Sequence, residues 1–156
     1  MGTHHQGTPQ EVQALDAFIK LKRGVAALQG QLNDGIAAFG LSESQFGTLE
    51  ALYHLGPLCQ RALGEKLLTS GGNMTLVIDN LEKRALVQRV RSVEDRRFIA
   101  VHLTEQGRAL MAEVFPIHAA QVTACMSVLS FEEQAELGKL CKKLGLGLKS
   151  SKEQAS

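Results

Sequence analysis

The sequence predicts a mainly α-helical protein with a small β-hairpin, built as a winged helix-turn-helix with dimerisation helices at its N- and C-termini. Two short amphipathic segments, at about 60–67 and 72–84, are joined by a Gly-containing turn. Two segments rich in β-branched residues follow at once and predict a hairpin. Long amphipathic segments at both ends of the chain complete the pattern.

Composition limits the size and class of the protein. The 156 residues, 44% of them hydrophobic, suffice for one compact domain or for a small domain with dimerisation helices. Formal net charge is +1, yet six basic and two acidic side chains lie between residues 83 and 97, which marks one basic region. No apolar run approaches the roughly 20 residues that span a bilayer, and the N-terminus lacks signal-peptide features, so we expect a cytoplasmic protein without membrane contact.

The first helix follows a flexible N-terminus, residues 1–10, and lies within 11–40. Leu15, Phe18 and Ile19 begin its apolar stripe, which glycines interrupt at a cost of about 1 kcal/mol each relative to alanine. Such a helix needs a partner to pack against, so we assign it to dimerisation.

The predicted winged helix covers residues 41–104. Ser42 and Gln45 form a capping box that starts its first helix, and Pro57 ends that helix. The next helix, at about 60–67, leads into a turn at 69–73. The fourth helix places apolar residues at i, i+3, i+4 and i+7, which gives one clean core face: Met74, Val77, Ile78 and Leu81.

The hairpin and the last helices complete the chain. Strands containing Val87 and Val90, and then Val101 and Leu103, flank a polar connection at 92–97. Residues 105–148 supply the remaining dimerisation helices. The last of these carries Leu137, Leu140 and Leu144 and is expected to end at Gly145 and Gly147, before a flexible tail at 149–156.

The stretch LEKRALVQRVRSVEDRRFIAVHLTEQGRAL resembles the recognition helix, wing and following helix of the MarR (multiple antibiotic resistance regulator) family. The resemblance covers about residues 12–146, and Asp95-Arg96-Arg97 followed by Leu103-Thr104 and Gly107 is its most specific part. It implies a homodimeric transcription regulator, a ligand-responsive repressor, that binds a pseudo-palindromic operator. It also implies an effector, often a small aromatic or phenolic anion, between the dimer helices and the DNA-binding lobe.

The sequence departs from the family at two points. Ala85 stands where the family usually has glycine, and a side chain there costs roughly 1 kcal/mol if the backbone is left-handed, so we expect a locally altered turn. No cysteine precedes Cys59, which argues against the mechanism of the peroxide-sensing branch.

Candidate DNA-binding residues lie on the fourth helix and around the hairpin. The helix N-terminus attracts phosphate, asparagine can pair with adenine, and an exposed leucine at position 76 can touch a thymine methyl or face a neighbouring helix. For Ser70, capping the helix without touching DNA is an equal alternative. Arg89 and the basic residues around it are expected to contact phosphates, which position a protein without reading sequence. The candidates outside the wing tip are Ser70, Gly72, Asn73, Thr75, Leu76, Asn80, Lys83, Arg84 and Arg91.

The wing tip carries the strongest candidates. An arginine at a hairpin tip can enter the narrow, electronegative minor groove, and the resemblance assigns this role to Arg97. Asp95 can hold its guanidinium in a bidentate pair, while Arg96 can meet a phosphate. A solvated charge cluster is the alternative.

Other chemistry is weakly supported. No nucleotide-binding, serine-hydrolase or zinc-protease motif occurs, so no enzyme activity or cofactor is expected. The five histidines are too dispersed for a metal site and suit surface or capping roles. Three widely spaced cysteines fit neither a disulfide framework nor a metal site, but Cys59 lies where oxidation could tilt the DNA-reading unit.

Two alternatives to a DNA-binding regulator stay open. A winged helix can bind a partner protein with the same helix and wing, and a redox sensor could use Cys59 or Cys125. A DNA-binding regulator must lose affinity for duplex DNA as the salt concentration rises, which separates it from a protein-binding module. DNA binding that is unchanged by peroxide would exclude the redox sensor.

Overall fold

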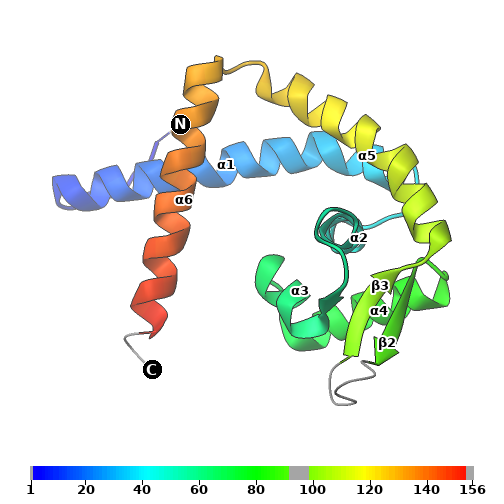
Figure 1. Ribbon diagram of the computed structural model, residues 1–156. Helices are drawn as coiled ribbons and strands as arrows, with labels where there is room; N and C mark the ends of the chain where they lie inside the picture. The colour runs from blue at the N-terminus through cyan, green and yellow to red at the C-terminus, as the bar shows by residue number, and fades with distance from the viewer. Residues whose placement is uncertain (1, 92–98, 154–156) are drawn as a thin grey trace. The chain divides into compact units, whose positions relative to one another are not determined.

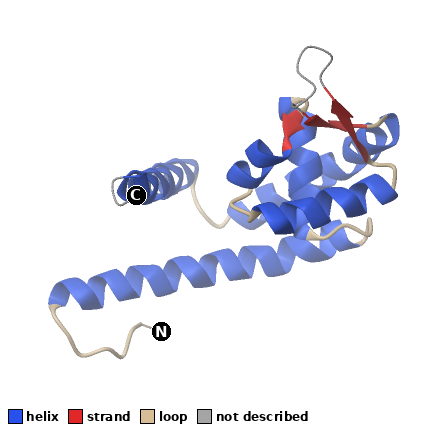
Figure 2. Cartoon of the chain, turned by 90° about the horizontal axis from the view of Figure 1, so that it is seen from below, coloured by secondary structure: helices blue, strands red, loops and turns tan. Residues whose placement is uncertain are grey.

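A computed structural model describes residues 2–91 and 99–153 (Figure 1). Figure 2 shows that helices dominate the chain and that the strands form one small sheet, as the sequence predicts. The elements in chain order are α1 (Pro9–Ala37), α2 (Glu43–Leu55), β1 (Leu58–Cys59), α3 (Gln60–Lys66), α4 (Gly71–Lys83), β2 (Val87–Arg91), β3 (Ile99–Leu103), α5 (Glu105–Met126) and α6 (Phe131–Glu153).

The chain forms two compact units, residues 1–121 and 122–156, and α5 begins in the first and ends in the second. The first unit contains the core. Helix α2 packs on α4 and on β3, and α3 packs on α4. The four predicted apolar positions of α4 are all buried, and the largest fully buried side chains of the core are Leu49, Leu52, Leu63, Met74, Ile78, Leu81 and Met111.

Local sequence signals set the helix ends. Ser42 and Gln45 form the predicted capping box, in which Ser42 Oγ accepts from the N–H of Gln45 at 3.3 Å. Gly56 ends α2 with a φ of 78°, a conformation that glycine adopts without steric cost. Helix α1 begins at Pro9, inside the segment expected to be flexible, because Thr8 and Glu11 form a second capping box.

The sheet has three strands in the order β1-β3-β2, one more than predicted. The hairpin of β2 and β3 is as expected, with Arg89 opposite Val101. Strand β1 adds Leu58 opposite Val101 and Cys59 opposite Ala100 on the other edge of β3. Its two residues follow Pro57 and are too few to show the alternation from which a strand is recognised.

Two further expectations are wrong. The turn at Ala85 is not altered: its φ is 55°, so alanine itself adopts the left-handed conformation there. Helix α6 does not end at Gly145 and Gly147 but continues to Glu153. A glycine ends a helix when its backbone turns left-handed, and neither glycine does so.

Among the described residues, one helix, α5, is long and apolar enough to cross a membrane, judged by length and composition alone. No such segment was expected from the sequence; α5 qualifies because Glu113 is its only charged residue after Arg108. Its Met111 and Val114 are buried in the core of the first unit, although only 11% of the apolar window as a whole is buried. Ile117, further along, is exposed.

Candidate nucleic-acid interface

The turn between α3 and α4 sets the start of the predicted reading helix. Leu63 anchors α3 in the core, and the Thr69 N–H donates to the Gly64 carbonyl at 2.9 Å, which closes the turn. Leu68 lies at the outside of this turn, 83% exposed and with a φ of 52°. A left-handed leucine is uncommon, so the geometry of the turn overrides the preference of its side chain.

Helix α4 presents one face to the core and the opposite face to solvent. In the first turns of α4, every residue predicted to read DNA is exposed: Gly72, Asn73, Thr75 and Leu76. Asn80, further along the helix, is half-buried. The structure therefore gathers these predicted residues on one accessible surface, with Asn80 at its edge.

Ser70 is the cap of α4. Its hydroxyl oxygen accepts from the backbone N–H of Asn73 at 3.4 Å, in the geometry of an N-cap. Capping is therefore the local role of Ser70. The exposed side chain of Asn73 lies one turn further into the helix and is not needed for that cap.

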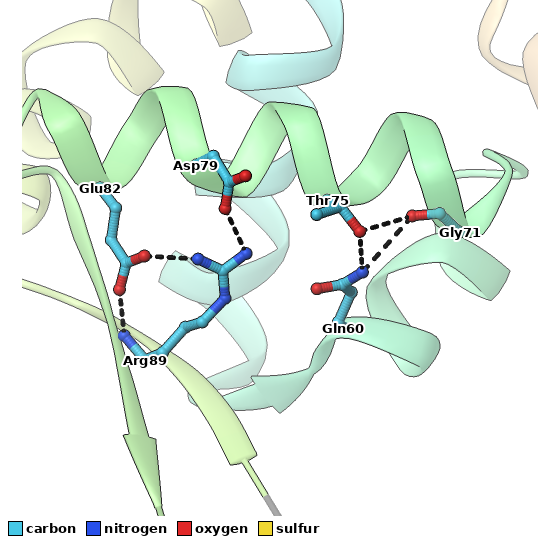
Figure 3. Close-up of polar contacts among 6 residues, drawn as sticks. All are labelled: Gln60, Gly71, Thr75, Asp79, Glu82 and Arg89. Carbon is cyan, nitrogen blue, oxygen red and sulfur yellow. Dashed lines mark hydrogen bonds and ion pairs between the residues drawn. The ribbon is translucent and has the colours of Figure 1, made fainter.

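The hydroxyl of Thr75 is held by two partners (Figure 3). It donates to the Gly71 carbonyl oxygen at 3.0 Å, and Gln60 Nε2 donates to it at 2.5 Å. Gln60, the first residue of α3, thus ties the two helices of the reading unit together. Gln60 could not be recognised from the sequence, because a contact between residues 15 apart leaves no local pattern.

Arg89, expected from the sequence to contact phosphates, is held by two carboxylates of α4. Its Nη2 lies 2.7 Å from Asp79 Oδ1, and its Nη1 pairs with Glu82 Oε2 (Figure 3). Its backbone N–H also donates to Glu82 Oε1 at 2.8 Å. Partial burial opposes the charge of Arg89, but hydrogen bonds and charges from Asp79 and Glu82 outweigh it and raise its pKa above the ordinary value.

The other basic candidates differ in what they contact. Lys83 and Arg91 are exposed. Arg84 is exposed as well, but its Nη1 donates to the Gly40 carbonyl at 2.7 Å, which joins α4 to the loop after α1. Asp95, Arg96 and Arg97, predicted at the wing tip, lie outside the described residues.

A cavity of about 440 Å³ lies in the first unit against α1, α2 and α5. Its lining includes Phe46, Glu43, Glu50 and His118, and neither lysine nor arginine belongs to the described lining. The His118 ring lies 4.4 Å from that of Phe46, and its Nδ1 is buried without a hydrogen-bond partner among the described residues. His118 as a whole is half-buried, where the sequence suggested a surface or capping role.

The predicted dimerisation residues of each unit are accessible. In the first unit, Phe18 of α1 is 56% exposed, Leu15 is exposed and Ile19 is half-buried. In the second unit, α6 exposes Leu137, Leu140 and Leu144. Large apolar side chains thus remain exposed on both helices, which is typical of surfaces that take part in protein–protein contacts.

The cysteines and possible metal ligands form no assembled site. Cys59 is half-buried at the N-cap of α3 and makes no side-chain capping bond. Cys125 is half-buried and Cys141 exposed, and all three thiols are free. Within residues 2–91 and 99–153, no group of three His, Cys, Asp or Glu side chains could hold a metal ion.

Comparison with known proteins gives one consistent result. Residues 41–99 match the sequence model of the MarR family. The HTH-type transcriptional regulator MhqR of Bacillus subtilis is 36% identical over 137 residues, which cover 88% of this chain and 94% of MhqR.

Solved structures agree with the sequence match. AbsC, a MarR family transcriptional regulator from Streptomyces coelicolor, superimposes with a TM-score of 0.83 at 25% identity, covering 94% of this chain and 99% of AbsC. Bordetella bronchiseptica BpsR, whose DNA binding is regulated by 6-hydroxynicotinic acid, gives a TM-score of 0.74 at 26% identity. This match covers 83% of this chain and 98% of BpsR.

Proposed function

The chain belongs to the MarR family of DNA-binding transcriptional regulators, and from this premise we propose that it is a ligand-responsive repressor that binds a pseudo-palindromic operator as a homodimer in the cytoplasm. The observation that carries the proposal is the outer face of α4, which keeps Asn73, Thr75 and Leu76 exposed while its other face fills the core. A helix that is anchored in this way can enter the major groove without local unfolding.

Within this proposal, side chains divide into those that read bases and those that position the protein. Asn73 can make two hydrogen bonds to adenine in the major groove. Lys83 and Arg91, exposed beyond the reading turns, suit phosphates. At the wing, the sequence supports Arg97 as a minor-groove contact, with Asp95 orienting it and Arg96 on a phosphate.

Dimerisation would bury the exposed apolar residues of α1 and α6. Two copies related by a twofold axis would present two reading helices, which match the two halves of a pseudo-palindrome. Light scattering at micromolar concentration should give the mass of two chains. A monomeric mass with α1 and α6 folded would remove the homodimer from the proposal.

We propose the cavity beside Phe46 and His118 as the effector site, and its chemistry favours an uncharged aromatic effector. A phenolic hydroxyl can donate to the unpaired Nδ1 of His118, while Glu43 and Glu50 disfavour an anion in a lining without lysine or arginine. BpsR, by contrast, responds to a carboxylic acid. Glu43 is already engaged, because Gln29 Nε2 donates to it at 2.8 Å.

A matched pair of ligands tests this effector class. We expect 4-hydroxybenzamide to release bound operator at lower concentration than its anionic isostere 4-hydroxybenzoate. Glu50→Gln should narrow the difference, since it removes one negative charge from the lining. Equal potency of the two compounds, or stronger release by the anion, would refute the preference for a neutral effector.

Selection of bound sequences from random duplexes tests the DNA-binding function itself. We expect enrichment of an inverted repeat with half-sites about 10 base pairs apart, centre to centre. Affinity for it should fall steeply with salt because phosphate contacts release counterions. A protein-binding winged helix would enrich no sequence and show no such salt dependence.

A further inference from the structure

We propose that Thr75 and Leu76 form an apolar reading surface that selects thymine through its 5-methyl group. This inference rests on the proposed DNA-binding function and adds the kind of base that the reading helix recognises. A threonine in a reading helix can hydrogen-bond to bases through its hydroxyl. Here we assign to Thr75 an apolar contact through its methyl group instead.

The hydroxyl of Thr75 is already committed within the protein. Its single proton is donated to the Gly71 carbonyl, and one of its lone pairs accepts from Gln60. It therefore has no proton left for the acceptors that guanine, adenine and thymine present in the major groove. The two bonds also fix the side-chain rotamer of this β-branched residue, so its methyl group has a defined position.

Leu76 is the second part of the surface. It is 58% exposed, although the four apolar residues on the opposite side of α4 are buried. The exposed Leu76 and the fixed methyl of Thr75, consecutive in sequence, place two apolar groups on the exposed side of the first turns of the reading helix. In the major groove, the 5-methyl of thymine is the apolar group that matches them.

Two glycines leave this surface accessible. Side chains on a helix lean towards the N-terminus and lie over the residue four positions earlier, which is Gly71 for Thr75 and Gly72 for Leu76. A Cβ at either glycine would meet no atom within 4 Å outside its own stretch of α4, although Gln60 Nε2 lies 3.4 Å from the Gly71 carbonyl oxygen. A base edge can therefore approach both apolar groups without meeting another side chain of the preceding turn.

The charged groups of the same helix do not compete for this surface. The carboxylates of Asp79 and Glu82, further along α4, are held by Arg89. The remaining polar group in the first turn, the exposed amide of Asn73, complements a methyl contact because it can bond to a neighbouring base.

Deoxyuridine substitution isolates the methyl group, since uracil keeps every hydrogen-bonding group of thymine. In the selected operator, each thymine is replaced in turn and affinity is measured by fluorescence anisotropy. We expect one or two thymines in each half-site at which the replacement weakens binding by about fourfold, the effect of removing one methyl from an apolar contact. Replacing such a thymine pair with 5-methylcytosine·guanine should be tolerated better than cytosine·guanine.

Protein variants identify which side chains sense the methyl. Thr75→Ser keeps the hydroxyl with both of its bonds and removes only the methyl; Leu76→Ala removes the exposed apolar group. We expect each variant to lose the uracil effect at one thymine, whereas Thr75→Val, which keeps a methyl, should retain it. A uracil effect that persists in Thr75→Ser and Leu76→Ala arises from DNA shape or another side chain and would overturn the proposal.

These experiments distinguish a failure of thymine-methyl recognition from a failure of the proposed DNA-binding function. Normal operator binding without any uracil effect would refute methyl recognition and leave the DNA-binding function standing. Absence of sequence-specific binding to any duplex would refute the function and the inference together.

Discussion

Arg89 on β2 and Asp79 on α4 form an ion pair, with Arg89 Nη2 2.7 Å from Asp79 Oδ1 (Figure 3). Glu82, also on α4, pairs with Nη1 of the same guanidinium. This contact joins the first strand of the wing to the reading helix. The single positive charge of Arg89 also offsets one of the two negative charges that Asp79 and Glu82 place on this helix. The sequence suggested a phosphate contact for Arg89, and the structure gives it an architectural role.

Arg89→Gln should therefore lower stability, by about 1–2 kcal/mol, because it leaves two partly buried carboxylates without their partner. Operator affinity should also fall, yet the slope of log affinity against log salt should change little, because no phosphate contact is lost. Arg91→Gln is the matched variant: it should leave the unfolding free energy nearly unchanged and reduce the salt slope by about one unit per protomer. If Arg89→Gln instead reduced the salt slope without lowering stability, Arg89 would be a phosphate contact.

Asn73→Ala should weaken operator binding by about 1–3 kcal/mol and leave binding to random DNA nearly intact, as expected for a base contact. Ser70→Ala is the comparison within the same turn. Loss of its bond to the Asn73 N–H should lower the unfolding free energy by about 1 kcal/mol. Equal losses on operator and random DNA would reassign Asn73 to positioning the helix.

Ala85→Gly should stabilise the fold by up to about 1 kcal/mol, measured as a higher midpoint of thermal unfolding. The φ of 55° at Ala85 is strained for alanine and free of strain for glycine. Part of the gain is offset because glycine has more conformational freedom in the unfolded chain. An unchanged or lower midpoint would mean that the turn does not hold Ala85 in this conformation.

Gly107→Ala should destabilise the fold by about 1–3 kcal/mol, because a Cβ at this position would overlap the carbonyl oxygen of Leu86. That carbonyl is fixed, since it accepts from the Thr104 N–H at 3.1 Å. Gly24→Ala in α1 is the control: no atom lies within 4 Å of the added methyl, so alanine should be tolerated there. Similar effects of the two substitutions would argue against close packing at Gly107.

The sequence was informative where one element carries its own pattern. The apolar spacing of α4 predicted its buried face, and the capping box at Ser42 predicted the start of α2. Both signals lie within one or two helical turns, so no tertiary information is needed to recognise them. The exposed reading face follows from the same spacing.

What the sequence missed depends on contacts between distant segments. The Gln60–Thr75 bond, the pairing of Arg89 with α4 and the ring contact between Phe46 and His118 join residues without a shared local pattern. The left-handed turn at Ala85 was misjudged because its neighbours, and not its own preference, set its backbone. One such neighbour is Thr104, whose hydroxyl donates to the Ala85 carbonyl at 2.7 Å.

Titration of the selected operator against a scrambled duplex of equal length tests most directly whether the chain is a sequence-specific, dimeric DNA-binding regulator. We expect two chains per operator and an affinity at least about a thousandfold above that for the scrambled duplex at physiological salt. Affinity for both duplexes should fall as salt rises. Equal affinity for the two duplexes, or one chain bound per operator, would contradict the central claim.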